Sequence, residues 1–260
     1  MKIKTALIFI LFFSSASNCF CWEKNVLISP LRIVIDNNKR TETAKIINPG
    51  DSKTTYRISL VSIDSDIYGV QKENNNPLVT QSKAIEILKF SPKKTTLLPG
   101  EIQTIRFFVK KPFDLEPGEY RTHLKISPLP DIETKEEAKN DKGLNIKLHY
   151  LISATIPIII RHKSTFVSVN IEKAEINKNI INLYLSRTGT ASALFDVEIL
   201  NKNEIAGQRN RNAFYTPNTS LILPVELKNN FQKNDVLEIF IKNAENNDRF
   251  IYDAMKLNIF

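Results

Sequence analysis

The chain has 260 residues, and its 36 Lys and Arg against 28 Asp and Glu give a net charge of +8. This length fits two domains of ordinary size or one large domain. The basic residues are dispersed along the chain and do not cluster with aromatic residues, which argues against a nucleic-acid-binding protein. After residue 21, no stretch of the sequence is long and apolar enough to span a membrane.

Residues 1–21 predict a secretory signal peptide. Two lysines precede a short apolar run over residues 6–13, and small residues follow it. Cleavage is expected after Ser17 or after Cys21, and we favour Cys21. The only cysteines are Cys19 and Cys21, and residues two apart rarely meet the geometry of a disulfide. The sequence therefore predicts an exported protein without a disulfide framework.

Short apolar stretches separated by turn sequences fill the first half of the chain. The expected strands cover residues 26–36 (broken near Pro30), 41–48, 54–63, 85–91, 103–109 and 119–126. Pro-Gly pairs beginning at Pro49, Pro99 and Pro117 predict type II turns, because Pro presets the first central φ and Gly tolerates a positive φ at the second. Polar residues predict loops over 64–82 and 129–143. Short strands joined by such turns predict an antiparallel β-sandwich.

The stretch from Leu144 to Arg161 alternates strictly, with an apolar residue at every even position. Such a period of two predicts a β-strand with one buried face. At roughly 3.3 Å per residue the strand would be about 55 Å long, which is more than a small sandwich can cover. Pro157 cannot donate to a sheet, so we expect an edge or a bulge there. A long apolar edge strand promotes aggregation, so this one is expected to pair with another chain.

The second half of the chain also consists of short β-rich segments. Residues 162–165 read as a linker, and the expected strands cover residues 166–171, 180–185, 193–200, 221–225, 236–241 and 249–259. No segment has convincing helical periodicity. The prediction is an all-β protein with two β-sandwich domains, residues 22–163 and the smaller 164–260.

The sequence shows no catalytic constellation. Its three histidines, His123, His149 and His162, have no Cys or carboxylate at metal-ligand spacing, and we interpret them as surface or structural residues. There is no Gly-rich phosphate loop and no nucleophile elbow. The chain is therefore predicted not to be an enzyme, and to need no metal, no cofactor and no small-molecule substrate.

Several segments together resemble the PapD-like periplasmic chaperones of pilus assembly, in what would be a non-classical branch of that family. They are Ser29–Asp36, Asn48–Gly50, Tyr56–Ser59, Ser91–Lys94, Leu98–Glu101, Gln103–Arg106, Gly118–Leu124 and Ile156–His162. The match is collinear over residues 26–163 and specific as a set. It implies two immunoglobulin-like domains in a boomerang arrangement, a periplasmic location, and delivery of pilus or fimbrial subunits to an outer-membrane usher.

The resemblance also implies that the long strand is lent to an incomplete subunit, which is a form of β-strand addition. The donated side chains would be Leu148, Tyr150 and Ile152, and the set would be extended by Leu144 and Ile146. The alternative is that these residues pack in the chain's own core. We favour that alternative for residues 154–160 and donation for residues 144–152.

Arg32 matches the family's cleft arginine, which binds the carboxylate terminus of the subunit. A guanidinium suits this task because its planar fork can make a bidentate pair. The family's partner lysine would stand four residues before Arg161, where this chain has Pro157. The anchor would then need Lys147 or Lys163, or Arg32 alone.

Arg161 resembles an arginine that bridges acids of the two domains and fixes the angle between them. Glu119 matches the acid of the first domain, and Asp253 is the acid expected from the second. Two rival functions stay open: a secreted structural β-sandwich subunit or adhesin, and an enzyme whose site assembles only in space, such as a polysaccharide hydrolase.

Overall fold

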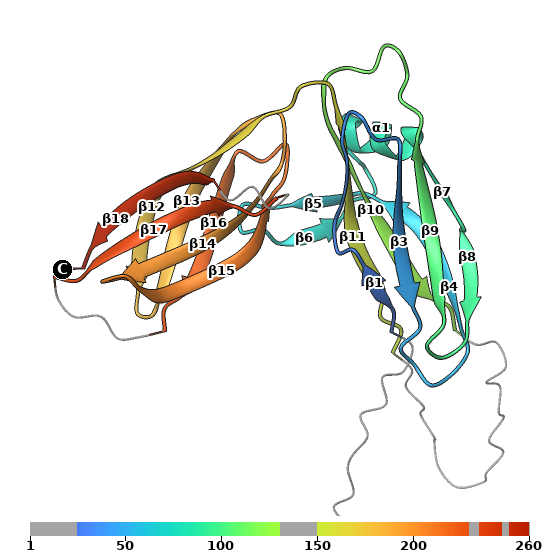
Figure 1. Ribbon diagram of the computed structural model, residues 1–260, viewed down its shortest axis with the longest axis horizontal. Helices are drawn as coiled ribbons and strands as arrows, with labels where there is room; N and C mark the ends of the chain where they lie inside the picture. Colours follow the sequence, from blue (N-terminus) through green and yellow to red (C-terminus); the bar gives the residue numbers. More distant parts are fainter. Residues whose placement is uncertain (1–24, 131–149, 229–233, 246–249, 260) are drawn as a thin grey trace, which may run out of the picture.

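The computed structural model describes residues 25–130, 150–228, 234–245 and 250–259 (Figure 1). They form four sheets arranged as two β-sandwiches, and a small hairpin between them. We call residues 25–162 the N-terminal sandwich and residues 167–259 the C-terminal sandwich. The all-β prediction is confirmed, apart from one short helix.

The N-terminal sandwich consists of one sheet ordered β1-β3-β9-β7 and another ordered β2-β11-β10-β4-β8. Its strands are β1 (Leu27–Ser29), β2 (Ile33–Ile35), β3 (Thr41–Ile47), β4 (Thr54–Val61), β7 (Leu88–Ser91), β8 (Lys94–Leu97), β9 (Ile102–Val109), β10 (Gly118–Pro128) and β11 (Ala154–His162). The core lies between the sheets because alternate side chains of each strand point inward. Tyr56, Phe107 and Ile158 are among the fully buried side chains.

The C-terminal sandwich pairs a sheet ordered β12-β13-β16 with a sheet ordered β15-β14-β17-β18. Its strands are β12 (Val167–Asn177), β13 (Ile180–Gly189), β14 (Ala193–Asn201), β15 (Glu204–Phe214), β16 (Ser220–Glu226), β17 (Val236–Asn243) and β18 (Ile251–Asn258). A separate apolar cluster, which includes Phe195 and Phe214, fills the space between these sheets. The sequence did not predict β15, because its centre is polar and exposed.

The sequence predictions fail between β4 and β7. A loop was expected over residues 64–82 and a strand over 85–91. The structure has instead a hairpin of β5 (Ile63–Ser65) and β6 (Gln71–Glu73), and then helix α1 (Val79–Ile87). The expected strand over 85–91 is confirmed only from Leu88 to Ser91, as β7. The helix is short and buries only Gln81, Ala84 and Ile87, which is too few residues for a visible helical period. The buried Gln81 amide donates to the Ile63 carbonyl oxygen at 3.1 Å, so the helix depends on a tertiary contact.

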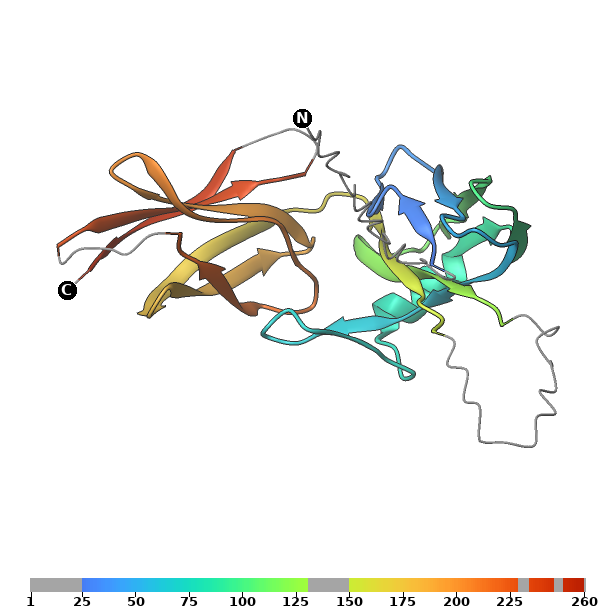
Figure 2. The same ribbon diagram turned by 90° about the horizontal axis from the view of Figure 1, so that it is seen from below.

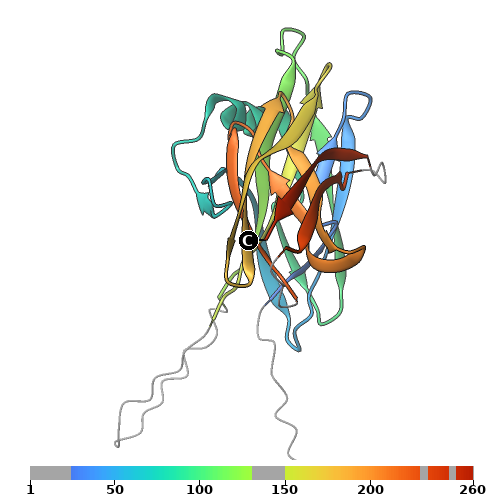
Figure 3. The same cartoon turned by 90° about the vertical axis from the view of Figure 1, so that its left-hand side faces the viewer.

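The β5–β6 hairpin reaches from the N-terminal sandwich to β16 of the other sandwich (Figures 2 and 3). The backbone N–H of Ile222 donates to the Ile67 carbonyl oxygen at 2.6 Å. The side-chain amide of Asn218 donates to the Ser65 carbonyl oxygen at 2.5 Å. The hairpin therefore links the two sandwiches at a place distant in sequence from the 162–167 connection.

The long alternating segment is divided in the structure. Strand β11 begins at Ala154, pairs antiparallel with β10 along its whole length, and pairs parallel with β2 only at residues 158–160. In the described part of the chain, residues 154–157 thus have no strand on their other side. Pro157 lies on this free edge, as predicted. No helix in the described ranges is long and apolar enough to cross a membrane.

Candidate functional site

The candidate site lies on the outer face of the β2-β11-β10 sheet, where it meets the C-terminal sandwich. Even-numbered residues of β10 and β11, such as Leu124 and Ile158, point into the core. Odd-numbered residues point to the opposite side, because side chains alternate along a strand. Glu119, Arg121 and Arg161 therefore face the second sandwich, and each makes a hydrogen bond to a residue of it.

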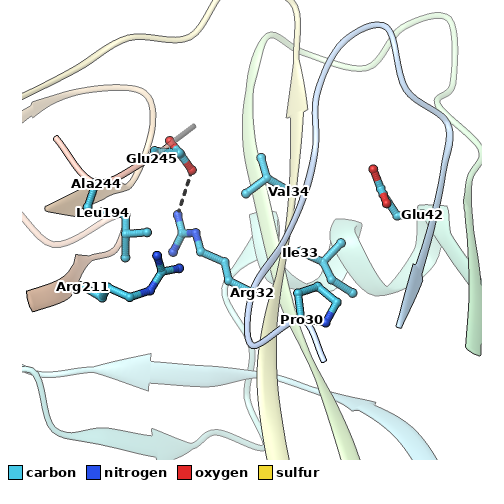
Figure 4. A pocket seen from close by; sticks show the side chains of 9 residues that line it. All are labelled: Pro30, Arg32, Ile33, Val34, Glu42, Leu194, Arg211, Ala244 and Glu245. Atoms are coloured by element: carbon cyan, nitrogen blue, oxygen red, sulfur yellow. Dashed lines mark hydrogen bonds and ion pairs between the residues drawn. The ribbon is translucent and has the colours of Figure 1, made fainter. Parts of the chain in front are cut away.

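Arg32 stands between β1 and β2 in a pocket of about 500 Å³ (Figure 4). Its side chain is 8% exposed, and its Nη2 lies 3.5 Å from Oε1 of Glu245. Its Nε and Nη1 are buried and have no hydrogen-bond partner among the described residues. An unmade bond of a buried charged donor costs free energy, so an anion that reached these donors would be stabilised.

The pocket is shared by both sandwiches. Its lining residues are Pro30, Arg32, Ile33, Val34 and Glu42 from the N-terminal side, and Leu194, Arg211, Ala244 and Glu245 from the C-terminal side. Glu42 is hydrogen-bonded to Lys39 at 2.9 Å. The pocket therefore contains two arginines, Arg32 and Arg211, and two acids, Glu42 and Glu245. Glu245 forms ion pairs both with Arg32 and with a third arginine outside the lining.

That third arginine is Arg161, which is 12% exposed and joins acids from both sandwiches. Its Nε lies 3.4 Å from Oε2 of Glu119, and its Nη2 lies 2.9 Å from Oε2 of Glu245. Its Nη1 lies 3.9 Å from Oδ1 of Asp36. Burial alone would lower the pKa of Arg161, but Glu245 and Glu119 outweigh burial and raise the pKa above its ordinary value. The guanidinium is therefore a permanent charge at the junction.

Glu119 is the most deeply buried acid of this network, with a side chain that is 0% exposed. It accepts hydrogen bonds from the backbone N–H of Ser192 at 2.9 Å and from the Ser192 hydroxyl. The Thr216 hydroxyl donates to it at 3.5 Å. One carboxylate of the N-terminal sandwich is thus held by two segments of the other sandwich.

The prediction for Asp253 is wrong. Asp253 lies on β18, and its carboxylate accepts a hydrogen bond from the backbone N–H of Ile171 at 2.7 Å. Its role is to join β18 to β12. The acid that reaches Arg161 from the C-terminal sandwich is Glu245, which lies two residues after the end of β17. No periodicity or motif singles out Glu245, because its role depends on how the two sandwiches meet.

A second buried polar group on this face consists of Arg121, His123 and Tyr215. The Arg121 guanidinium lies 4.2 Å from the centre of the Tyr215 ring, and Nη2 of Arg121 donates to the Thr216 carbonyl oxygen at 3.2 Å. His123 packs edge-on against Tyr215, and neither of its ring nitrogens has a partner in the described chain. Burial lowers the pKa of His123 to about 3, with help from the nearby charges of Arg121 and Arg32.

The residues predicted for donation lie partly outside the described chain. Leu144, Ile146 and Leu148 fall in the 131–149 segment, which the structure does not describe, and so does Lys147. Tyr150 and Ile152 are described, and they are 68% and 59% exposed. They precede the free edge of β11 directly.

Lys163, the other base considered for the anchor, is not among the residues that line the Arg32 pocket. Its backbone N–H is hydrogen-bonded to the Asn37 side chain. In the part of the chain that the structure describes, no group of three or more His, Cys, Asp or Glu side chains is placed to hold a metal ion.

No family model and no curated protein matches the sequence. Solved structures do match the fold. One is a chain from the chaperone–tip adhesin complex of CFA/I fimbriae biogenesis, with 16% identity and a TM-score of 0.50 over 90% of this chain and 98% of that chain. Another comes from the Salmonella enterica SafA pilin in complex with the SafB chaperone, with 10% identity and a TM-score of 0.51 over 91% and 97%. This chain therefore has the fold of the fimbrial chaperones, with two immunoglobulin-like β-sandwiches.

Replacing Arg161 by Ala should lower the free energy of unfolding by about 3 kcal/mol, because removal of one partner leaves the other charge, here Glu119, buried and uncompensated. Urea unfolding followed by circular dichroism measures this change. Lys125→Ala is the control, since its ion pair with Glu73 is exposed and should contribute less than about 1 kcal/mol. Equal losses in the two variants would contradict a structural role for the Arg161 network.

Replacing His123 by Gln should flatten the dependence of stability on pH. The unfolded chain binds a proton on His123 near its ordinary pKa of 6.5, whereas the folded chain binds it only near about 3. As the pH falls between these values, the wild-type protein should therefore lose up to about 1.4 kcal/mol per pH unit relative to the variant. Urea titrations from about pH 7 to about pH 4 measure the difference. If the free energy of unfolding depended on pH in the same way in the wild type and in the variant, His123 would take up a proton equally well in the folded and unfolded states, and the prediction would be wrong.

Proposed function

We propose that this protein is a periplasmic chaperone of pilus or fimbria-like subunits. It holds a subunit by lending it the segment that precedes β11, and it delivers the subunit to an outer-membrane usher. Its two immunoglobulin-like domains, residues 22–163 and 164–260, form a boomerang around the captured subunit. The predicted signal peptide supports export to the periplasm, and the shared fold supports the class of protein.

The observation that carries this proposal is the free edge of β11. Residues 154–157 have unpaired backbone on one side, and Tyr150 and Ile152 continue the even, inward-facing phase of the strand while standing exposed. An incoming strand could therefore form a main-chain ladder along this edge, while alternate side chains enter the subunit's core. Each large apolar side chain so buried contributes about 1.5–3 kcal/mol, so the capture needs no nucleotide or cofactor.

The Arg32 pocket supports a second contact. Its unused buried donors fit the carboxylate at the end of a polypeptide, because two N–H groups of a guanidinium match two carboxylate oxygens. The pocket is lined by Ile33 and Val34 of β2, the strand that pairs with residues 158–160 of β11. A subunit strand that runs along β11 can therefore have its terminus at Arg32, which would fix the register of the pairing.

The structure does not favour the rival function of a polymerising subunit. Such a subunit would have an incomplete sandwich that waits for a strand from its neighbour. Here β11 fills the N-terminal core with the buried side chains of Ile156, Ile158 and Ile160. The sandwich is completed by its own strand, and only the continuation of that strand is left exposed.

The double variant Tyr150→Glu and Ile152→Glu should abolish subunit capture, because two charges cannot enter the apolar groove of a subunit. Both side chains are exposed, so the variant should fold normally. The measurement is purification of the tagged protein from the periplasm of its own bacterium, with identification of the bound subunit by mass spectrometry. Phe113→Glu is the control, because Phe113 is fully exposed in the loop before β10. Undiminished capture by the double variant would refute strand donation.

Replacing Arg32 by Ala should weaken capture by roughly tenfold to a hundredfold, which corresponds to the loss of hydrogen bonds between charged groups. The affinity can be measured by diluting urea-unfolded subunit into increasing concentrations of the chaperone variant and quantifying the complex. Arg106→Ala is a matched control, since Arg106 is an exposed arginine of β9, in the other sheet. An unchanged affinity would remove the anchoring role from Arg32 and leave strand donation standing.

A further inference from the structure

The Arg32 pocket contains a second arginine, and the proposed function does not yet use it. Arg211 belongs to β15 of the C-terminal sandwich and lines the same pocket. In Figure 4 the guanidinium of Arg32 is directed at Glu245, and the side chain of Arg211 extends into the same part of the pocket. Arg211 is exposed, and together with the buried Arg32 it adds positive charge to the lining of this pocket, which favours an anion there.

The resident acids do not occupy all the donors of these two arginines. Glu245 lies nearer to Arg161, at 2.9 Å, than to Arg32, at 3.5 Å. Glu42 is bonded to Lys39. Among the described residues no acid is paired with the Arg211 side chain, and Nε and Nη1 of Arg32 are without partners. The feature of the pocket that an additional carboxylate can use is therefore the unfilled hydrogen-bonding capacity of its two arginines.

The backbone at Arg211 is built to aim its side chain. The register between β14 and β15 slips between Phe195 and Val197, so that residues 210 and 211 form a bulge. Arg211 has a φ of +54°, a left-handed conformation that is unfavourable for an arginine. Its backbone N–H donates to the Asp196 carboxylate at 2.6 Å, which holds the bulge in place.

Bulges re-aim a side chain relative to the regular alternation of a strand. Arg209, two residues earlier, shows the contrast. Its Nη1 donates to the Pro224 carbonyl oxygen at 2.8 Å, and it is not among the lining residues of the pocket. Arg209 and Arg211 lie on opposite sides of the bulge, and only the side chain of Arg211 lines the pocket.

We propose that Arg211 is the second cation of the carboxylate anchor, and that it binds the terminal carboxylate of a captured subunit together with Arg32. This inference rests on the proposed function. It assigns to the C-terminal sandwich the role that a lysine at position 157 would have had, because Pro157 cannot supply a charge. Two planar forks can share the two oxygens of one carboxylate. A bound terminus would then join the two sandwiches through a single group.

The test uses the full mature protein and a simple probe. The probe is an N-acetylated valine-threonine-valine tripeptide with a free carboxylate, and the same peptide with an amidated end is its neutral counterpart. Nitrogen-15 NMR follows the Nε–Hε signals of Arg32 and Arg211 during the titration. We expect the free-acid peptide to shift both signals and the amide to shift neither.

The variants separate this inference from the function on which it rests. Arg211→Ala should weaken the binding of the free-acid peptide about tenfold, and Arg211→Lys should weaken it less because the charge remains. Arg209→Ala is the matched control and should bind as the wild type does. If Arg32 responds and Arg211→Ala binds normally, the role of Arg211 is refuted while Arg32 remains the anchor. If neither signal shifts, the carboxylate anchor as a whole is refuted.

Discussion

The buried charge of Glu119 is the constraint on which the junction between the two sandwiches depends. A carboxylate that is fully removed from water must be paired and hydrogen-bonded, and its partners here come from both sides. Arg161 is its neighbour across the β10–β11 ladder, whereas Ser192 and Thr216 belong to the C-terminal sandwich. Separation of the sandwiches would remove Ser192 and Thr216 and leave Arg161 as the remaining partner of this acid. Arg161 also pairs with Glu245 of the C-terminal sandwich. Glu245 in turn lines the pocket that contains Arg32 and Arg211.

The free edge of β11 exists because the parallel β2 strand is short. It covers only residues 158–160 of β11, and the remaining residues before them are open on that side. An exposed apolar edge is a risk for any protein, because it can pair with whatever strand it meets. Pro157 removes one donor from this edge, which limits indiscriminate pairing. In the proposed function, this edge pairs with a strand of the subunit. The Arg32 pocket would then favour a strand whose terminal carboxylate reaches Arg32.

The hairpin and the bulge show how local departures from regular structure serve the junction. The β5–β6 hairpin is bonded to β16 by Ile67 and Ser65, so the relative position of the two sandwiches is supported at a second place. The bulge of β15 turns Arg211 toward the N-terminal sandwich. Neither feature contributes to a core of its own sandwich. Both instead connect groups that are far apart in the chain.

The sequence by itself determined most of the strands that alternate and the two sandwiches, because a period of two follows directly from the geometry of an extended chain. The same alternation runs unbroken from Leu144 to Arg161, so the division of that segment before Ala154 came from the family resemblance and not from the pattern. The resemblance also identified Glu119 and Arg161, which the structure pairs, and it predicts the anchoring role of Arg32. Only the tertiary structure decided that Glu245 and not Asp253 reaches Arg161, that residues 79–87 form a helix, and that Arg211 lines the same pocket as Arg32. These contacts join residues more than eighty positions apart or depend on a buried partner such as Gln81. Their geometry is fixed by how the two sandwiches meet, and no local pattern of residues records that.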